Sequence, residues 1–286
     1  MQKIDIKAYA KINLALDVVG TRPDGYHEVR MIMQTINLYD RIELGITAQP
    51  GITMRSNLGF LPNDEGNLAY RAAKLFLEET GCGLGVHINL NKRIPVAAGM
   101  AGGSSDAAAV LLGLNELMSA GLSKKQLSEL GVRIGADVPF CILGGTALAE
   151  GIGEVLTPLR PFRKGHCLIV KPSFSVSTPW AYSNLKPAEE LSHPDVDRLL
   201  EAVEQGDYEA LCQGAGNVLE SVVIPANPAI RTIKARMRDL GADLALMSGS
   251  GPTVFGLFLE HEAAKRAYYD FKVGKYGRST YLVDFV

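Results

Sequence analysis

The sequence predicts an α+β fold in two domains, residues 1–158 and residues 159–286, and three observations support this prediction. The chain has 286 residues, 47% of them hydrophobic, which suits about two domains of roughly 150 residues each. Its first third alternates polar and apolar residues as antiparallel strands do. Its second part runs strand, helices, hairpin, helix, strand, the order of a ferredoxin-like split βαβ sandwich.

The elements of the first domain follow from hydrophobic periodicity and from end signals. Strands are expected near residues 3–19, 27–38, 41–48, 86–94, 140–149 and 154–158. Asn67 is expected to cap a helix that Gly81 ends, and Ser123 with Gln126 forms a capping box at the start of another. Between these two helices an apolar helix follows a glycine-rich stretch. Pro158 marks the expected domain boundary.

The second domain opens with an apolar strand over residues 167–172. Helical patterns follow near residues 188–205 and 207–220. A further helix is expected to have Asn227 as its N-cap, Pro228 at its first position and Gly241 as its stop. After this helix we expect strands at 244–247 and 253–258, a helix at 261–271 and a strand at 279–286.

The charge balance argues against a nucleic-acid partner. Lys and Arg total 29 against 31 Asp and Glu, a formal charge of -2, so no broad basic field is expected to hold a polyanion. A small anionic ligand remains possible, because backbone amides and a few lysines can bind it. The four cysteines form no CxxC pair, and neither a signal peptide nor an 18-residue apolar run is present. We therefore expect a cytoplasmic protein with free thiols and no membrane contact.

A glycine-rich loop joins a predicted strand to a predicted helix and suits a phosphate group. Small residues let a ligand approach the backbone, and the amides at a helix start favour anions. The loop contains neither GxxxxGK[ST] nor GxGxxG, so it is not one of the common nucleotide fingerprints. A flexible connector capped by serine is the alternative. The loop residues are Pro95, Val96, Ala97, Ala98, Gly99, Met100, Ala101, Gly102, Gly103, Ser104 and Ser105.

A second glycine cluster, Ser248–Pro252, lies between two apolar runs. Taken alone, it is more typical of a hairpin turn than of a binding element. Together with the first glycine-rich loop it becomes a candidate binding element, because two glycine-serine loops could meet over one polyphosphate.

Lys11 and Asp137 are candidate catalytic groups. Lys11 lies in an apolar strand, where a lysine is usually exposed, and Asp137 follows Gly-Ala, where an aspartate is usually a turn or cap residue. If the two side chains met, the ammonium would keep the carboxylate ionised and would stabilise charge on a transferring phosphoryl group. His27 beside Tyr26 could bind a planar ligand, whereas the other histidines have no metal-ligand spacing, so no metal cluster is expected.

Three stretches in this order resemble the GHMP kinases, the superfamily of galactokinase, homoserine kinase, mevalonate kinase and phosphomevalonate kinase. They are AYAKINLALDVVG near the N-terminus, PVAAGMAGGSSDAA in the loop and MSGSGPTVF near the C-terminus. The resemblance covers essentially the whole chain. It implies a two-domain GHMP kinase fold, with an N-terminal domain like ribosomal protein S5 and a ferredoxin-like C-terminal domain.

The resemblance also implies an activity and its residues. The activity is ATP-dependent phosphorylation, with Mg²⁺, of the 2-hydroxyl of a cytidine diphosphate-linked methylerythritol, and Lys11 and Asp137 are the catalytic pair. ATP would be bound by the loop Pro95–Ser105 and by Gly249, Ser250 and Gly251, with Asn67 and Lys92 near the adenine and Ser105 as a metal ligand. The substrate would be bound by Asn13, Tyr26, His27, Thr178 and Tyr182. These residues fall on both sides of Pro158, so we expect the active site to use both domains.

One departure from the family pattern concerns the phosphate loop, where alanines stand in place of glycines found in many relatives. Because alanine does not freely adopt positive φ, we expect such geometry only at the retained glycines, including Gly99. Two alternatives stay open: a GHMP kinase for mevalonate, a sugar or homoserine, and a nucleotide-binding sensor without catalysis. No heptad or apolar stripe indicates the oligomeric state.

Overall fold

The computed structural model describes residues 2–187, 190–274 and 279–286, and the chain forms two compact units. Unit 1 comprises Met1–Ala10, Leu38–Val96 and Ala101–Leu143, and unit 2 comprises Lys11–Asn37, Ala97–Met100 and Gly144–Val286. Strands β1 (Lys3–Thr21) and β2 (His27–Thr47) contribute residues to both units. The units are therefore not two successive stretches of chain, and the expected domain boundary at residue 158 stays a prediction.

The strands of unit 1 pair through the second half of β2. β2 runs antiparallel to β4 (Gly85–Asn91), which in turn pairs in parallel with β3 (Gly51–Ser56). We expected two strands over residues 27–48, but β2 is continuous. The charged residue at the expected break, Asp40, is fully buried and accepts hydrogen bonds from the backbone amides of Arg93 and Ile94. A buried carboxylate with partners does not interrupt a strand.

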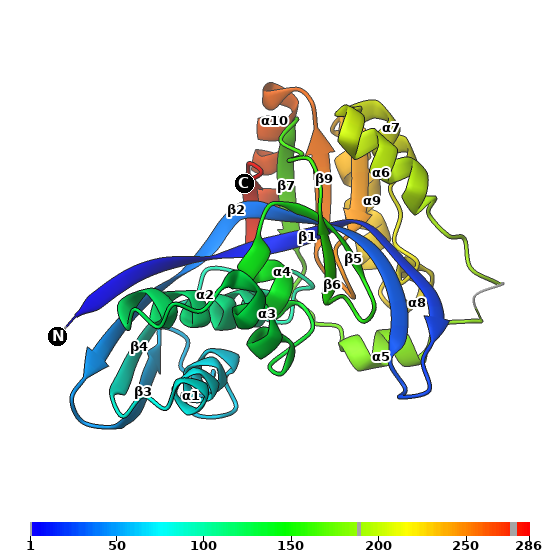
Figure 1. Ribbon diagram of the computed structural model, residues 1–286. Helices are drawn as coiled ribbons and strands as arrows, with labels where there is room; N and C mark the ends of the chain where they lie inside the picture. Colours follow the sequence, from blue (N-terminus) through cyan, green and yellow to red (C-terminus); the bar gives the residue numbers. More distant parts are fainter. Residues whose placement is uncertain (1, 188–189, 275–278) are drawn as a thin grey trace. The chain divides into compact units, whose positions relative to one another are not determined.

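The helices of unit 1 are α1 (Leu68–Thr80), α2 (Gly102–Leu117), α3 (Lys124–Val132) and α4 (Val138–Leu143). α1 and α2 pack side by side (Figure 1). The predicted ends at Asn67 and Gly81 are confirmed, as is the capping box of Ser123 with Gln126. Apolar residues of all four helices form one core with those of the strands, including Phe76, which is fully buried.

The apolar run expected as a strand over residues 140–149 divides into two elements. Residues 138–143 form α4, and only Thr146–Glu150 form a strand, β5. Gly144 and Gly145 separate them, with φ angles of +73° and +75° that favour glycine. Periodicity does not distinguish a short buried helix from a strand, and here packing of Val138 beside Gly131 favours the helix.

The first part of unit 2 is a set of antiparallel strands around β2. Met31–Gln34 of β2 pair with β5, and β5 pairs with β6 (Val155–Pro158).

A second sheet in unit 2 has the strand order β10-β7-β9-β8, and all three pairings are antiparallel. Its strands are β7 (His166–Lys171), β8 (Leu244–Met247), β9 (Val254–Phe258) and β10 (Ser279–Val283). Helices α9 (Ala229–Asp239) and α10 (His261–Val273) pack against this sheet (Figure 1). This order of strands and helices confirms the ferredoxin-like arrangement.

Four further helices of unit 2 lie between β7 and α9. They are α5 (Thr178–Ser183), α6 (Val196–Gln205), α7 (Tyr208–Gly214) and α8 (Glu220–Ala226). The helix expected near 188–205 begins only at Val196, after an Asp195 N-cap, and residues 188–189 lie outside the described residues. Asn227 ends α8 and Pro228 is the N-cap of α9, so the expected cap is displaced by one residue.

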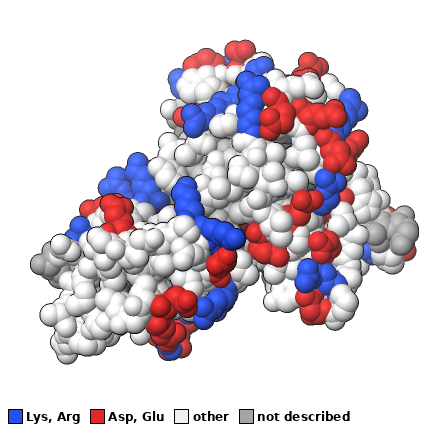
Figure 2. Space-filling model, in the orientation of Figure 1, with Lys and Arg blue, Asp and Glu red and all other residues white. Residues whose placement is uncertain are grey.

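Acidic and basic side chains are interspersed on the face that Figure 2 shows, in agreement with the formal charge of -2. All four cysteines are free thiols. Among the described residues, no helix has both the length and the apolar character that a membrane crossing requires.

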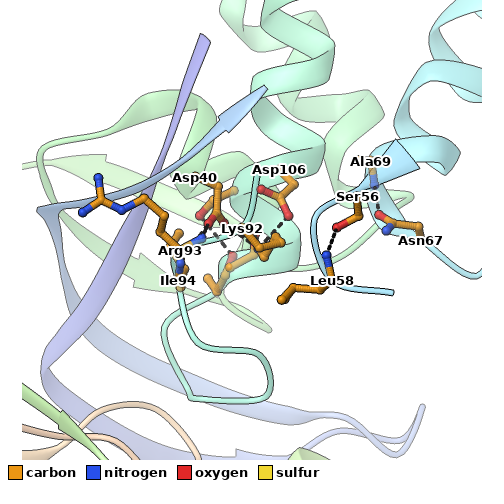
Figure 3. Close-up of polar contacts among 12 residues, drawn as sticks. Asp40, Ser56, Leu58, Asn67, Ala69, Lys92, Arg93, Ile94 and Asp106 are labelled. Atoms are coloured by element: carbon orange, nitrogen blue, oxygen red, sulfur yellow. Dashed lines mark hydrogen bonds and ion pairs between the residues drawn. The ribbon is translucent and has the colours of Figure 1, made fainter. Parts of the chain in front are cut away.

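A buried ionic network holds the start of α2 in unit 1 (Figure 3). The Lys92 ammonium, at the end of β4, donates to Asp40 Oδ2 at 2.5 Å and to Asp106 Oδ2 at 2.7 Å. It also donates to the Gly102 carbonyl, the first residue of α2, at 3.3 Å. The side chains of Lys92, Asp40 and Asp106 are at most 4% exposed, so each charge depends on the others for its stabilisation.

Asp106 is the least satisfied member of this network. Its Oδ1 is buried and has no hydrogen-bond partner. Burial raises the pKa of Asp106 well above its ordinary value of 3.8, and the neighbouring Asp40 raises it further, although Lys92 opposes the shift. Folding therefore favours the protonated carboxyl. This stabilisation is complete below pH 3.8 and is lost as the pH rises through the raised pKa.

Replacing Asp106 by asparagine tests this linkage. The Asp106→Asn variant keeps the shape but cannot ionise, so its melting temperature should rise relative to the wild type as the pH increases above 3.8. Thermal unfolding from acidic to mildly alkaline pH measures the difference. As a control, Asp40→Asn should lower stability because its amide group cannot accept all the bonds that Asp40 accepts. A difference between Asp106→Asn and wild type that stays constant with pH would contradict the prediction.

Candidate active site

Lys11 and Asn13 lie on the same face of β1 and are both buried. The Lys11 ammonium donates to Asn13 Oδ1 at 2.7 Å, and Asn13 Nδ2 donates to Met31 Sδ at 3.4 Å. Lys11 is only 4% exposed, so the alternative of an outward-facing surface lysine is wrong. The Lys11 amide donates to the Met100 carbonyl at 3.2 Å. This bond places the lysine beside residues 97–100 of the glycine-rich loop.

The glycine-rich loop has positive φ at three residues, Ala97 (+50°), Gly99 (+71°) and Ala101 (+55°). The expectation that only the retained glycines adopt this geometry is therefore wrong. Gly102 and Gly103 belong instead to the first turn of α2. A left-handed alanine costs about 1 to 2 kcal/mol, so the surrounding contacts must offset this strain at both alanines. Within the loop, Ala98 and Met100 are buried and Val96 is exposed.

The first turn of α2 suits an anion at its N-terminus. The N-cap is Ala101, which has no side-chain acceptor for the first amides of the helix. A Cβ atom at Gly102 would lie 3.2 Å from Lys92 Nζ, and one at Gly103 would lie 3.3 Å from Leu68 Cδ1. These two glycines are thus required in part by packing against the neighbouring strand and helix.

Ser105, the predicted metal ligand, has structural partners, and its role at a metal stays a prediction. It is 1% exposed, and its hydroxyl donates to the Tyr9 carbonyl at 2.7 Å. Cys141 Sγ and the Ala101 carbonyl lie 3.4 and 3.0 Å from the same oxygen. The hydroxyl therefore ties α2 to β1 inside unit 1. Ser104, one residue earlier, is partly exposed.

The two residues expected near adenine have structural partners. The Lys92 ammonium donates to Asp40 and Asp106 in the buried network of Figure 3, and the prediction that Lys92 lies near the adenine stays a prediction. Asn67 Oδ1 accepts from the Ala69 amide at 3.0 Å as the N-cap of α1, and its Nδ2 donates to the Pro62 carbonyl. Asn67 is partly exposed. A role for it in adenine binding stays a prediction.

The structure brings the two glycine loops together inside unit 2. Ser248 Oγ donates to the Gly99 carbonyl at 2.9 Å. A Cβ atom on Gly99 would lie 2.2 Å from the Ser248 carbonyl oxygen, and one on Gly249 would lie 3.0 Å from the Gly99 carbonyl oxygen. Only glycine permits this approach. The segment Ser248–Gly251 also lies in the turn between β8 and β9, as the hairpin alternative expected, and its role in binding a ligand stays a prediction.

Two glycines of this turn have positive φ, Gly249 (+56°) and Gly251 (+81°). Between them, Ser250 Oγ lies 2.7 Å from Thr178 Oγ1, at the start of α5. A Cβ atom on Gly249 would be 3.5 Å from Asn13 Oδ1. The turn therefore joins a residue predicted to bind substrate, Thr178, to the strand that carries Asn13.

His27 and Tyr182, both predicted to contact a base, lie together in unit 2. Their ring centroids are 5.2 Å apart with an interplanar angle of 45°. His27 also lines a cavity of about 290 Å³, close to the lower limit for small-molecule sites. Tyr26 is 59% exposed, and its backbone amide donates to Asp24 Oδ1 at 3.1 Å. The remaining lining residues are Val18, Gly20, Thr21, Leu185, Lys186, Pro187 and Leu191.

Asp137 lies in unit 1 immediately before α4. Its carbonyl accepts from the Cys141 amide at 3.2 Å, and its side chain is partly exposed. The residue therefore directly precedes α4. Lys11 belongs to unit 2, so its pairing with Asp137 stays a prediction.

Three buried residues were not predicted from the sequence: Asp40, Asp106 and Asn217. Asp106 directly follows the two serines, and an acidic residue near the start of an apolar helix is a signal that could have been used. Asp40 and Asn217 carry no local signal, because their partners are 52 and 30 residues away. In the described residues, no group of three or more His, Cys, Asp or Glu side chains could hold a metal ion.

Comparison with known proteins identifies the family. Residues 67–145 match the GHMP kinases N terminal domain, and residues 199–273 match the GHMP kinases C terminal domain. A 4-diphosphocytidyl-2-C-methyl-D-erythritol kinase of Lachnoclostridium phytofermentans is 58% identical over 285 residues, covering 100% of this chain and 98% of the relative. The corresponding kinase of Geobacillus thermodenitrificans is 51% identical and covers 94% and 92% of the two chains.

Solved structures agree with this result. A 4-(cytidine 5'-diphospho)-2C-methyl-D-erythritol kinase superposes with a TM-score of 0.84 at 37% identity, covering 99% of both chains. A homoserine kinase from Cytophaga hutchinsonii has a TM-score of 0.82 at 21% identity, covering 99% of this chain and 96% of the other, which shows a shared fold. The chain has the two-domain GHMP kinase fold, and it belongs to the family of the 4-diphosphocytidyl-2-C-methyl-D-erythritol kinases.

Proposed function

We propose that this protein transfers the γ-phosphoryl group of ATP to the 2-hydroxyl of 4-diphosphocytidyl-2-C-methyl-D-erythritol, a step of non-mevalonate isoprenoid precursor biosynthesis. Relatives that are 50–58% identical over nearly the whole chain carry this kinase name. The observation that carries the proposal is the buried Lys11 ammonium beside a loop whose Gly99 meets a second glycine turn. A lysine next to converging backbone turns suits a transferring phosphoryl group.

In the proposed reaction, Asp137 and Lys11 have different roles. The Asp137 carboxylate accepts the proton of the 2-hydroxyl, and the resulting oxygen attacks the γ-phosphorus. The bond between the γ-phosphorus and the β,γ-bridging oxygen breaks, and ADP leaves. The Lys11 ammonium, oriented by the Asn13 amide at 2.7 Å, stabilises the negative charge on the γ-phosphoryl oxygens.

The phosphates of ATP are proposed to bind the backbone of the glycine-rich loop, the start of α2, and the turn Gly249–Gly251. Amides at a helix N-terminus and in glycine turns bind anions without side-chain cations. Mg²⁺ usually binds one or two carboxylates together with substrate phosphates, so we propose that the ion is bound together with the nucleotide. When bound, the ion neutralises charge on the β- and γ-phosphates. We assign no side chain to it.

The cytidine end of the substrate is proposed to bind at His27 and Tyr182, with Tyr26 as a second stacking surface. The tilted ring pair and the adjoining cavity of about 290 Å³ support this placement. Asn13 and Thr178 would contact the polyol and the phosphates. Because a ring pair and a cavity suit a planar base, they favour the cytidine-linked substrate over mevalonate, a simple sugar or homoserine.

The proposal also covers the cellular compartment of the enzyme and its partners. Four free thiols and interspersed surface charges support a cytoplasmic enzyme without a nucleic-acid or membrane partner. A nucleotide sensor without catalysis is the competing class. ADP release measured with the cytidine-linked substrate, mevalonate, homoserine and a sugar separates all these alternatives, since a sensor releases none and another GHMP kinase prefers a different acceptor.

The catalytic pair can be tested by substitution. Asp137→Asn and Lys11→Met should each lower kcat by about 10²- to 10⁴-fold, the usual contribution of a positioned acid-base or charged group. Both variants should keep cooperative thermal unfolding, so a loss of folding can be separated from a loss of chemistry. Steady-state ADP release measures kcat. A folded Asp137→Asn variant with wild-type kcat would refute the proposed mechanism.

The base site predicts a selective change in KM. Tyr182→Ala should raise the KM for the cytidine-linked substrate about 5- to 150-fold, because base stacking contributes about 1 to 3 kcal/mol. The KM for ATP should not change. Tyr269→Ala, at a tyrosine that is 63% exposed on α10, is the matched control and should leave both constants unchanged. Equal increases in both KM values for Tyr182→Ala would contradict the assignment.

The strained phosphate loop predicts a gain of stability. Ala101→Gly should stabilise the protein by about 0.5 to 1 kcal/mol, because relief of about 1 to 2 kcal/mol of left-handed strain exceeds the greater unfolded-state entropy of glycine. Urea unfolding measures the change. Ala263→Gly, inside α10, is the control and should lose about 0.5 to 1 kcal/mol. A destabilised Ala101→Gly variant would show that the alanine is not strained.

A further inference from the structure

A short segment of unit 2, residues 216–220, connects the strand of Lys11 to the glycine turn Ser248–Gly251. The Leu16 amide donates to the Gly216 carbonyl at 2.9 Å, and the Val218 amide donates to the Leu16 carbonyl at 3.0 Å. These two bonds fix the backbone on both sides of Asn217 against β1. β1 also carries Lys11 and Asn13, so the position of Asn217 is set relative to them.

The side chain of Asn217 reaches from this position to the glycine turn. Its Nδ2 donates to the Met247 carbonyl and to the Gly249 carbonyl, each at 2.8 Å. Its Oδ1 accepts from the Leu219 amide at 3.0 Å. Asn217 is 7% exposed, and both its donors and its acceptor are engaged. An amide is the side chain that can donate twice and accept once from this location.

Glu220 holds the same stretch of backbone from a second direction. Its Oε1 accepts from the Met247 amide at 2.8 Å, and its Oε2 forms an ion pair with Lys234 of α9. The amide and the carbonyl of Met247 are therefore both bound by side chains of one short segment. We refer to Asn217 and Glu220 together as the Asn-Glu clamp.

The clamp determines which way the peptide groups of the turn point. In a trans peptide the carbonyl and the following amide point in opposite directions. Because the Gly249 carbonyl points to Asn217, the amide of Ser250 points away from the clamp. Glycine lacks a side chain to limit its backbone, so a turn with φ of +56° at Gly249 needs such an external restraint.

We propose that Asn217 is a positioning residue for ATP: it holds the Gly249 carbonyl inward, so that the amide of Ser250 is presented to a phosphate oxygen. This inference rests on the proposed function of the turn as a nucleotide-binding element. Asn217 touches neither substrate and acts through the backbone of the turn. Its removal therefore affects the nucleotide more than the cytidine-linked substrate, which the turn reaches only through the contact of Ser250 with Thr178.

The test is the Asn217→Asp variant. Aspartate keeps the size and the acceptor, but it places a carboxylate oxygen against two carbonyl oxygens and loses both donated bonds. The KM for ATP should rise about tenfold or more, since buried polar groups lose their partners. The KM for the cytidine-linked substrate should rise clearly less than the KM for ATP, because Asn217 bonds to none of the residues proposed to bind that substrate. Calorimetry with a non-hydrolysable ATP analogue should show the same loss of affinity.

A role in stability alone would give a different result. It would reduce the fraction of active protein, and so the apparent kcat, while both KM values stayed at the wild-type level. Asn227→Asp is the matched control, because Asn227 donates to the Val223 carbonyl at the other end of α8 and should not affect ATP. If Asn217→Asp does not fold, Asn217→Ala removes the same bonds without adding charge and should also weaken ATP binding.

Two outcomes separate this inference from the proposed function. Wild-type protein that binds the ATP analogue but releases no ADP with any acceptor refutes the proposed function, and the analogue affinity of the variants still tests Asn217. Folded Asn217→Asp or Asn217→Ala protein with wild-type affinity for the analogue and a wild-type KM for ATP overturns the role of Asn217.

Discussion

The close approach of the backbone at Gly99 to the turn at Ser248 is the constraint on which the candidate site depends. The Ser248 hydroxyl donates to the Gly99 carbonyl at 2.9 Å, and a Cβ atom at Gly99 would lie 2.2 Å from the Ser248 carbonyl oxygen. A side chain on Gly99 would therefore separate the two turns. The Met100 carbonyl of the same loop accepts a hydrogen bond from the Lys11 amide. The position of Lys11 is therefore fixed relative to both turns. Asn217 makes a second connection, because its side chain donates to the Gly249 carbonyl while its neighbours bond to β1.

Two buried lysines, Lys92 and Lys11, have different surroundings. Lys92 is neutralised by the carboxylates of Asp40 and Asp106 and holds the start of α2 (Figure 3). The Lys11 ammonium donates to the amide oxygen of Asn13 at 2.7 Å. The two carboxylates beside Lys92 stabilise its buried charge and tie it to the fold of unit 1.

Local signals predicted much of the fold, and the errors have identifiable causes. Asn67, Gly81 and Ser123 mark helix ends correctly, because a cap uses only nearby backbone groups. The run at 138–143 is helical although its composition suggests a strand, since packing against Gly131 decides between two states of similar local energy. The left-handed alanines were also missed, because surrounding contacts offset a strain that the isolated residue would avoid.

The sequence by itself determined the α+β class, the family motifs and the types of residue in the site, because periodicity, turn residues and the glycine-serine loops are local properties of the chain. Only the tertiary structure decided which of these residues meet. It assigned Lys92 and Ser105 to structural bonds, joined Gly99 to Ser248, and placed Asn217 beneath the turn. Partners that lie tens to more than a hundred residues apart leave no pattern in the sequence, since folding alone brings their hydrogen-bonding groups within reach.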